Sequence, residues 1–198
     1  PKEETLAVRI SRALADRIDS LLVSDTISPS DRDFIHARDM FFLATADADG
    51  RPTCSYKGGE PGFVRVLDPR TIAFPNYDGN GMYLSTGNVL VNPAIALLFI
   101  DFEQPRRLRV NGTGFIQLDD PLLEQFAGAQ LIVRVRATQI FPNCPRYIHR
   151  MQMVEASAYV PRAGYVPPVP AWKRFEAFAD VLPMGDPAHA TSPREDDR

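Results

Sequence analysis

The chain of 198 residues is 44% hydrophobic and 24% charged, which suits one globular domain with arms better than two full domains. Its formal net charge of -3 gives no reason to expect nucleic acid or an anionic membrane surface as a partner. No apolar run reaches ~18 residues and no signal peptide opens the sequence, so we expect a cytoplasmic protein with no membrane partner.

Residues 1–37 predict a helical arm. Apolar residues recur at spacings of three and four from Leu6 to Leu22, which indicates an amphipathic helix that packs against the rest of the protein. Ser30 and Asp33 have the spacing of a capped start, and they predict a second short helix.

Residues 38–142 have the pattern of a mainly β domain. Four short apolar runs separated by turn residues, such as Asp49-Gly50, predict four consecutive strands in an antiparallel meander. Further strands are predicted after a helix, so that the helix is inserted between the fourth and fifth of six or seven antiparallel strands. We expect these strands to form a small barrel, which would leave no exposed sheet edge. The predicted strands span residues 40–46, 51–57, 63–67, 71–74, 94–102, 106–118 and 131–141, and the helix spans residues 82–91.

The C-terminal part of the chain is less regular. Asp119-Asp120-Pro121 predicts the cap of a short helix. Residues 143–187 predict a helix through Met153 followed by a proline-rich arm that lies across the barrel or a second subunit, and residues 188–198 predict disorder.

The loop after the fourth strand is rich in glycine and leads into the predicted helix. Unpaired N–H groups and the positive end of the helix dipole make such a helix start a natural site for a phosphate. Glycine allows the backbone to approach the anion closely. The alternative is a turn that only joins a strand to a helix.

Four segments in one order resemble the pyridoxamine 5'-phosphate oxidase-like family of FMN-binding split barrels. The likeness extends from about Asp39 to Phe141 and is carried there by FFLATADADGRPTCSYKGG, TIAFPNYDGNGMYLSTGNVLVNPAIALLFIDF and RRLRVNGTGFI. The fourth segment, NCPRYIHR, follows this range and resembles a segment of some members. The resemblance implies a six-stranded antiparallel split β-barrel, a homodimer, and FMN bound in a groove between the subunits. It also implies an oxidoreductase that acts on a small-molecule substrate or electron acceptor, which the sequence does not identify.

The resemblance also implies where the cofactor lies. The second predicted strand would run along the flavin ring with Lys57 near the phosphate. The next flavin-lining segment would be Phe74-Pro75-Asn76. Family members that are true pyridoxamine phosphate oxidases carry an adjacent Arg-Lys pair at the phosphate site, where this chain has Leu84 and Ser85. The implied cofactor-binding residues are Pro52, Thr53, Cys54, Ser55, Tyr56, Lys57, Phe74, Pro75, Asn76, Asn80, Ser85, Asn88, Arg107, Arg109 and Trp172.

Physical arguments bear on the roles of several of these residues. Ser85 and Asn88 are one helical turn apart, so both could face one ligand. Arg107 stands where the family often has a Gln at the pyrimidine edge of the ring, and a cation there would favour the reduced anionic flavin. Trp172 could stack on a flavin or anchor the arm to apolar surface. Cys54 alternates with Thr53 and Ser55, which predicts a small buried side chain rather than a reactive thiol.

Other functions stay open. A non-catalytic flavin-binding or stress-related module would have much the same sequence, and FAD, deazaflavin or haem could replace FMN on the same barrel. Haem would require His36 or His149 as an axial ligand, although neither has metal-ligand spacing with Asp, Glu or Cys. Cys54 and Cys144 also lack the spacing of a metal knuckle, so the sequence predicts no metal site.

Overall fold

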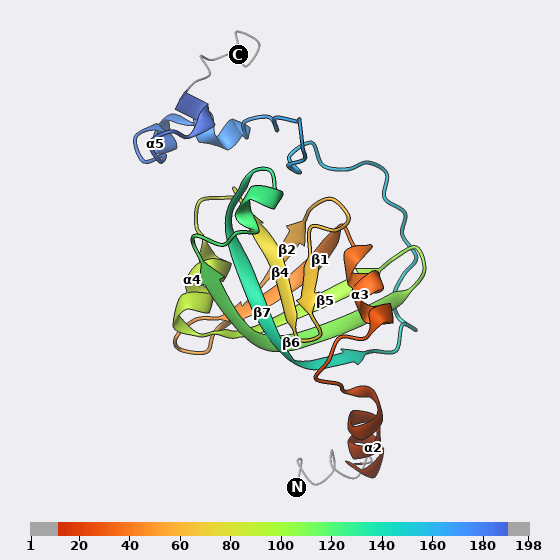
Figure 1. The fold of residues 1–198 in the computed structure, drawn as a ribbon. Helices are drawn as coiled ribbons and strands as arrows, with labels where there is room; N and C mark the ends of the chain where they lie inside the picture. The colour runs from red at the N-terminus through yellow and green to blue at the C-terminus, as the bar shows by residue number, and fades with distance from the viewer. Residues whose placement is uncertain (1–11, 190–198) are drawn as a thin grey trace, which may run out of the picture.

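A computed structural model of the chain describes residues 12–189, and its centre is one antiparallel sheet that curves around an apolar core (Figure 1). The mainly β class and the split-barrel architecture are confirmed. The sheet has seven strands rather than six, in the order β2-β1-β5-β6-β7-β4-β3, and it is open because its end strands β2 and β3 do not pair. The strands are Met40–Ala46 (β1), Pro52–Gly58 (β2), Arg65–Asp68 (β3), Thr71–Tyr77 (β4), Ala94–Asp101 (β5), Arg106–Gln117 (β6) and Ala129–Pro142 (β7).

The predicted four-strand meander is wrong. β1 and β2 form a hairpin whose turn contains Gly50 at φ +81°, and β3 and β4 form another, but β2 and β3 lie at opposite edges of the sheet. Between them the chain inserts Phe63 and Val64 into the core, where they are only 3% and 0% exposed. Burial of these two side chains carries the chain from one edge to the other instead of into a third hairpin.

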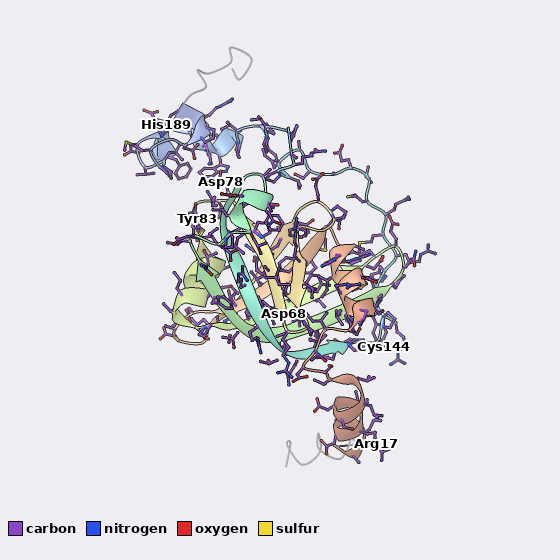
Figure 2. The ribbon with its side chains drawn as sticks, in the orientation of Figure 1. Arg17, Asp68, Asp78, Tyr83, Cys144 and His189 are labelled. Atoms are coloured by element: carbon purple, nitrogen blue, oxygen red, sulfur yellow. The ribbon has the colours of Figure 1, made fainter. Side chains whose placement is uncertain are left out.

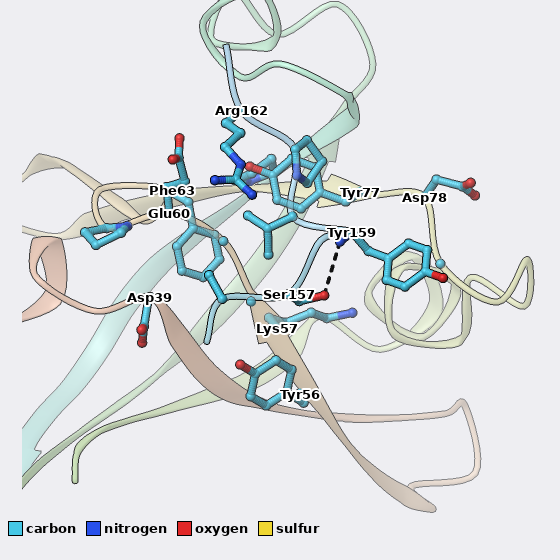
Figure 3. A pocket seen from close by; sticks show the side chains of 18 of the residues that line it. Asp39, Tyr56, Lys57, Glu60, Phe63, Tyr77, Asp78, Ser157, Tyr159 and Arg162 are labelled. Carbon is cyan, nitrogen blue, oxygen red and sulfur yellow. Dashed lines mark hydrogen bonds between the residues drawn. The ribbon is translucent and has the colours of Figure 1, made fainter. Parts of the chain in front are cut away.

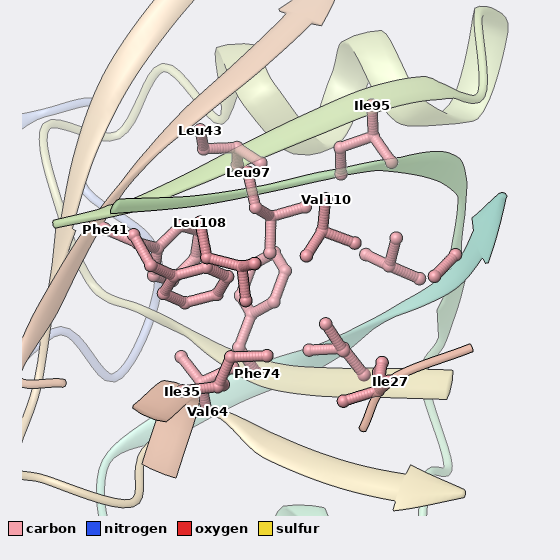
Figure 4. Close-up of a cluster of buried hydrophobic side chains, with 14 of the residues drawn as sticks. Ile27, Ile35, Phe41, Leu43, Val64, Phe74, Ile95, Leu97, Leu108 and Val110 are labelled. Carbon is pink, nitrogen blue, oxygen red and sulfur yellow. The ribbon is translucent and has the colours of Figure 1, made fainter. Parts of the chain in front are cut away.

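The core lies inside the curved sheet (Figure 4). Alternate residues of the strands point inward, as the period of two requires. Phe41 contacts the rings of Phe74 and Phe99 at centroid distances of 5.0 and 5.3 Å, and all three side chains are at most 1% exposed. The Phe41–Phe74 contact holds the middle of β4 against β1 across the core, and the loop after β4 lies beside β2, with which it lines one cavity.

Two helices pack on the sheet. Helix α3 (Pro29–His36) is capped by Ser28, whose side chain accepts a hydrogen bond from the Asp31 N–H. The cap is therefore two residues earlier than the predicted Ser30, and Pro29 occupies the first turn, where its missing N–H costs nothing. Helix α4 (Leu84–Val91) lies between β4 and β5 in the chain, as predicted, and starts two residues later than expected.

Helix α2 (Arg12–Leu22) does not pack on the sheet as we predicted (Figure 1). Its apolar residues Ile18, Leu21 and Leu22 are 47%, 72% and 48% exposed. The chain joins the barrel only after the helix, through a bridge between Ser24 and Ile140. Residues 6–11 of the predicted helix lie outside the described residues.

The C-terminal arm is extended rather than helical over residues 143–153, which contradicts the predicted helix. The Met151 N–H donates to the Phe102 carbonyl instead of to a helical partner, so the arm follows the end of β5. Beyond it lie the short helices η2 (Ala171–Arg174), α5 (Glu176–Ala179) and η3 (Pro187–His189), while η1 (Leu123–Gln125) follows the predicted cap at Asp120. Residues 190–198 of the expected tail lie outside the described residues. Within residues 12–189, no helix is long and apolar enough to cross a membrane.

Candidate functional site

The first candidate site is a cavity of about 460 Å³ between β2, the loop of residues 77–83 and the start of α4, which we call the α4 cavity. The segments that form it are far apart in the sequence but close in space because β4 ends beside β2. Most of the residues implied by the family resemblance converge on it. Those that line the cavity are Thr53, Cys54, Ser55, Tyr56, Lys57, Asn76, Asn80 and Ser85.

The loop before α4 has the backbone shape that its glycines suggested. Gly81 has φ +74°, and Tyr83 at the N-cap also has a left-handed φ of 50°. The Asn80 side-chain oxygen accepts a hydrogen bond from the Met82 N–H at 3.1 Å. No side chain caps α4 itself. The first N–H groups of the helix are therefore left to bind another acceptor, which a bound anion could provide.

Polar side chains from two elements meet at this helix start. The Ser55 and Ser85 hydroxyl oxygens are 3.1 Å apart, so β2 and α4 contact each other at the cavity wall. Lys57 lies two residues further along the same face of β2 and is half-buried. Burial lowers the pKa of the Lys57 ammonium. No carboxylate of the described residues forms an ion pair with it, so a ligand could supply the missing negative charge.

Asn88 faces the sheet rather than the cavity. Its side-chain N–H groups donate to Thr45 at 3.1 Å and to Thr53 at 3.3 Å, and the residue is 5% exposed. These bonds hold α4 against β1 and β2. Asn88 therefore positions the helix, while Ser85 reaches the cavity.

The second candidate site is a larger cavity of about 600 Å³, which we call the arm cavity. The turn after β2 and Phe63 form one wall, and residues 153–162 of the C-terminal arm form the other (Figure 3). It shares Tyr56, Lys57, Asn76 and Tyr77 with the α4 cavity, so the two are adjacent. Pro75 lines only the arm cavity. The sequence predicts an arm that lies across the barrel or a second subunit, but no motif in it marks Tyr159 or Arg162 as site residues.

The remaining implied residues lie outside both cavities of a single chain. Phe74 is in the core, Arg107 donates to the Cys144 carbonyl at 2.7 Å, and the Trp172 ring packs edge-on against Phe178 at 5.8 Å. In Figure 2, Cys144 lies at the opposite end of the barrel from Asp78 and Tyr83. The roles of Pro52, Asn88, Arg107, Arg109 and Trp172 toward a cofactor stay predictions.

The two faces of β2 have different surroundings. Thr53 and Ser55 face α4 and contact it, while Cys54 and Tyr56 alternate with them on the more exposed face, although both also line the α4 cavity. Cys54 is exposed, so the prediction of a buried filler is wrong. Tyr56 is also 62% exposed, so solvent reaches this outer face of β2 in the single chain.

The two histidines considered as haem ligands are not in the cavities. His36 Nε2 accepts a hydrogen bond from the Val66 N–H at 3.1 Å, and burial, followed by the charge of Arg32, lowers its pKa. His149 is exposed on the arm. Among residues 12–189, no group of three or more His, Cys, Asp or Glu side chains has the arrangement of a metal site.

Comparison with known proteins supports the resemblance. Residues 27–157, more than half of the chain, match the sequence profile of the family described as pyridoxamine 5'-phosphate oxidase. No curated protein matches the chain. Similar solved structures include a variant of HupZ from Group A Streptococcus, with 22% identity, TM-score 0.49, and 59% of this chain and 99% of that chain covered.

Two further structures have lower scores. The haem storage protein HutZ from Vibrio cholerae has 20% identity and TM-score 0.44, covering 59% of this chain and 94% of its own. A FAD-binding protein from Mesorhizobium loti has 16% identity and TM-score 0.43, covering 62% and 97%. Likenesses at these scores carry no conclusion about a ligand or a reaction.

Proposed function

Because the chain belongs to the pyridoxamine 5'-phosphate oxidase family, we propose that it is a flavin-dependent oxidoreductase that binds FMN with the phosphate in the α4 cavity. The observation that carries this proposal is the half-buried Lys57, which has no acidic partner among the described residues and lies beside an uncapped helix start. A desolvated cation without a partner is unfavourable in the free protein. A phosphate would satisfy it.

The donors at the cavity fit a phosphate well. Ser55 and Ser85 supply hydroxyl groups, Lys57 supplies a charge, and the first turn of α4 supplies backbone N–H groups and the positive end of its dipole. These donors would take the place of the Arg-Lys pair that true pyridoxamine phosphate oxidases carry where this chain has Leu84 and Ser85. Bound FMN would supply the hydride-accepting chemistry, while these residues hold and orient it.

We also propose that the functional unit is a homodimer. Tyr56, Phe42, Leu98 and Arg109 are directly paired across β2, β1, β5 and β6, so they share the outer face of the sheet. Strands are ~4.8 Å apart, so Arg109 lies about 14 Å from Tyr56 within one chain. A second copy packed on this face could bring its own Arg107 and Arg109 to the flavin.

A binding titration tests the phosphate site. Purified protein is mixed with FMN and, separately, with riboflavin, which lacks the phosphate, and the flavin fluorescence is measured. We expect FMN to bind more tightly. Lys57→Met and Ser85→Ala should each weaken FMN binding by roughly 1 to 3 kcal/mol and leave riboflavin binding nearly unchanged, because each removes a charge-assisted hydrogen bond.

Arg136→Ala is the matched control, since it removes one exposed positive charge from β7 and should change neither affinity. Protein that is colourless and gains no flavin absorbance on incubation with FMN would contradict the proposal. Mass analysis of any group released on denaturation distinguishes FMN from FAD, deazaflavin or haem.

Turnover separates an enzyme from a non-catalytic flavin carrier. The holoprotein is reduced and mixed with oxygen or other candidate acceptors, and its reoxidation is compared with that of reduced free FMN. An oxidoreductase should be reoxidised much faster than the free cofactor. A rate equal to that of free FMN with every acceptor would favour the non-catalytic role.

A further inference from the structure

The arm cavity has the walls of a site for an apolar ring. Phe63 is 3% exposed, and Tyr77 and Val160 are half-buried, so three apolar surfaces face the cavity from the turn after β2, from β4 and from the arm. A volume of about 600 Å³ is enough for a small molecule of two or three rings.

Arg162 gives this cavity a specific polar group. Its Nε is buried and has no hydrogen-bond partner, and no described carboxylate forms an ion pair with its guanidinium. One face of the guanidinium lies 4.6 Å from the centre of the Tyr165 ring, which holds the group in place. A buried donor usually has an acceptor in proteins, and at a cavity wall a ligand could provide it.

The acidic residues of the cavity do not occupy this position. Asp78 pairs with Lys173, and Glu60 and Glu155 are exposed, so water solvates the last two carboxylates at the rim. Asp39 lies near Tyr56, on the far side of the cavity from Arg162 in Figure 3. The buried part of the wall around Arg162 is therefore cationic, although the rim is acidic.

We propose that the arm cavity is the substrate site and that it takes a planar aromatic molecule bearing a carboxylate, with the carboxylate on Arg162 and the ring between Phe63 and Tyr77. The inference rests on the proposed function, because the wall shared with the α4 cavity would place such a molecule beside the cofactor. Guanidinium binds carboxylate in a planar, two-point geometry, which would orient the ring. The acidic rim would disfavour anions that lack the aromatic part.

Isothermal titration calorimetry tests the inference with three probes of one shape: 2-naphthoate, the neutral 2-naphthamide and the cationic 2-naphthylmethylamine. The full chain is titrated without FMN and again after saturation with FMN. We expect naphthoate to bind at least about tenfold more tightly than the amide, and the amine to bind most weakly, because only the carboxylate pairs with Arg162.

Variants assign the effect to one residue. Arg162→Gln should abolish the advantage of naphthoate over the amide, and Arg162→Lys should keep part of it. Arg146→Gln, an exposed arginine of the same arm outside the cavity, should keep all of it. Thermal unfolding of each variant shows whether the arm and barrel remain folded.

The outcomes separate this inference from the proposed function. Naphthoate that binds no better than the amide, or equally well to Arg162→Gln, would overturn the substrate site even if FMN binds normally. Failure of FMN to bind while naphthoate still binds through Arg162 would overturn the proposed function and leave the anion site of the arm cavity standing.

Discussion

Lys57 destabilises the ligand-free protein because its charge is desolvated, and we propose that the same charge binds a phosphate. Its ammonium is half-buried in the wall shared by both cavities, and burial lowers its pKa. Lys173 is a contrasting case, because it is 4% exposed but bonds to Asp78 and Asp186. Lys173 thus stabilises the folded state through its two carboxylate partners. Lys57 has no such partner in the described chain, and we propose that a ligand supplies one.

This contrast predicts opposite effects of one substitution on stability. Lys57→Met should raise the free energy of unfolding of the ligand-free protein by about 0.5 to 2 kcal/mol, since it removes a desolvated charge and keeps the aliphatic stem. The same variant should weaken FMN binding. Thermal unfolding without ligand measures the first effect, and Lys173→Met, which should lower the melting temperature, is the control. A lower melting temperature for Lys57→Met would mean that Lys57 has a structural partner.

At the residue scale, the sequence predicted which strand and loop meet but not every side-chain direction. Ser85 and Asn88 share one side of α4, yet the sheet lies close to that side as well, and helical spacing cannot choose between a cavity and a sheet. Alternation likewise separates Cys54 from Ser55 but does not say which face is covered. Asn88 therefore binds Thr45 and Thr53, and Cys54 is exposed.

The C-terminal arm is joined to the loop before α4 by an ion cluster around the buried Lys173. The Lys173 ammonium lies 2.5 Å from Asp78 and 2.6 Å from Asp186, so one side chain links η2 to both segments. Burial opposes both charges, but the hydrogen bonds from Lys173 and from the Ala188 N–H keep the pKa of Asp186 low, and the two carboxylates raise the pKa of Lys173. Since Asp78 is also part of the arm-cavity wall, the cluster fixes one edge of that cavity.

The cluster predicts how arm docking depends on pH. The contribution of Asp186 is present above its unfolded pKa of about 3.9 and is lost as pH falls through its lower folded value, while that of Lys173 is present below about 10.4 and is lost as pH rises through its higher folded value. Docking should therefore be constant between about pH 4 and 10 and weaken outside that range. Proteolysis of the arm at pH 7 should be at least about tenfold faster in Lys173→Met, because the buried carboxylate of Asp186 and the more exposed one of Asp78 both lose their partner.

The exposed-cation variant Arg146→Gln, on the same arm, should be cut at the rate of the original chain. Equal cutting of Lys173→Met and the original chain would show that other contacts hold the arm.

At the element scale, strand and helix positions followed from periodicity, whereas strand pairing did not. The pattern of β1, β5 and β6 predicted their bounds within a residue or two. Periodicity records which faces are apolar, not which strand lies alongside, so the crossing from β2 to β3 could not be predicted. The sequence predicts a strand at Phe63 and Val64, because an apolar pair has the same pattern in a strand and in a buried crossing.

For the whole molecule, the family resemblance predicted the architecture but not its closure. The expected barrel would have no edges, yet the sheet stays open at β2 and β3. An edge strand with an exposed outer side can be covered by another chain. The outer face carries apolar groups, since Tyr56 is 62% exposed and contacts Phe42 at 6.1 Å between ring centroids. These features support the proposed homodimer and connect it to the α4 cavity, which Tyr56 also lines.

If the flavin site is completed by a second copy, a substitution that separates the two copies should also weaken FMN binding. Light scattering at micromolar protein should give about twice the 22.1 kDa of one chain. Leu98→Asp, in the middle of the outer face, should give the single-chain mass, because an unpaired charge buried in an interface costs more than its contacts return. It should also weaken FMN binding as Arg109→Gln does, since both remove the partner's arginine from the flavin. Leu67→Asp, at the opposite edge of the sheet, should remain dimeric and bind FMN normally. A single-chain mass for the original protein with full FMN affinity would show that each chain binds the flavin alone.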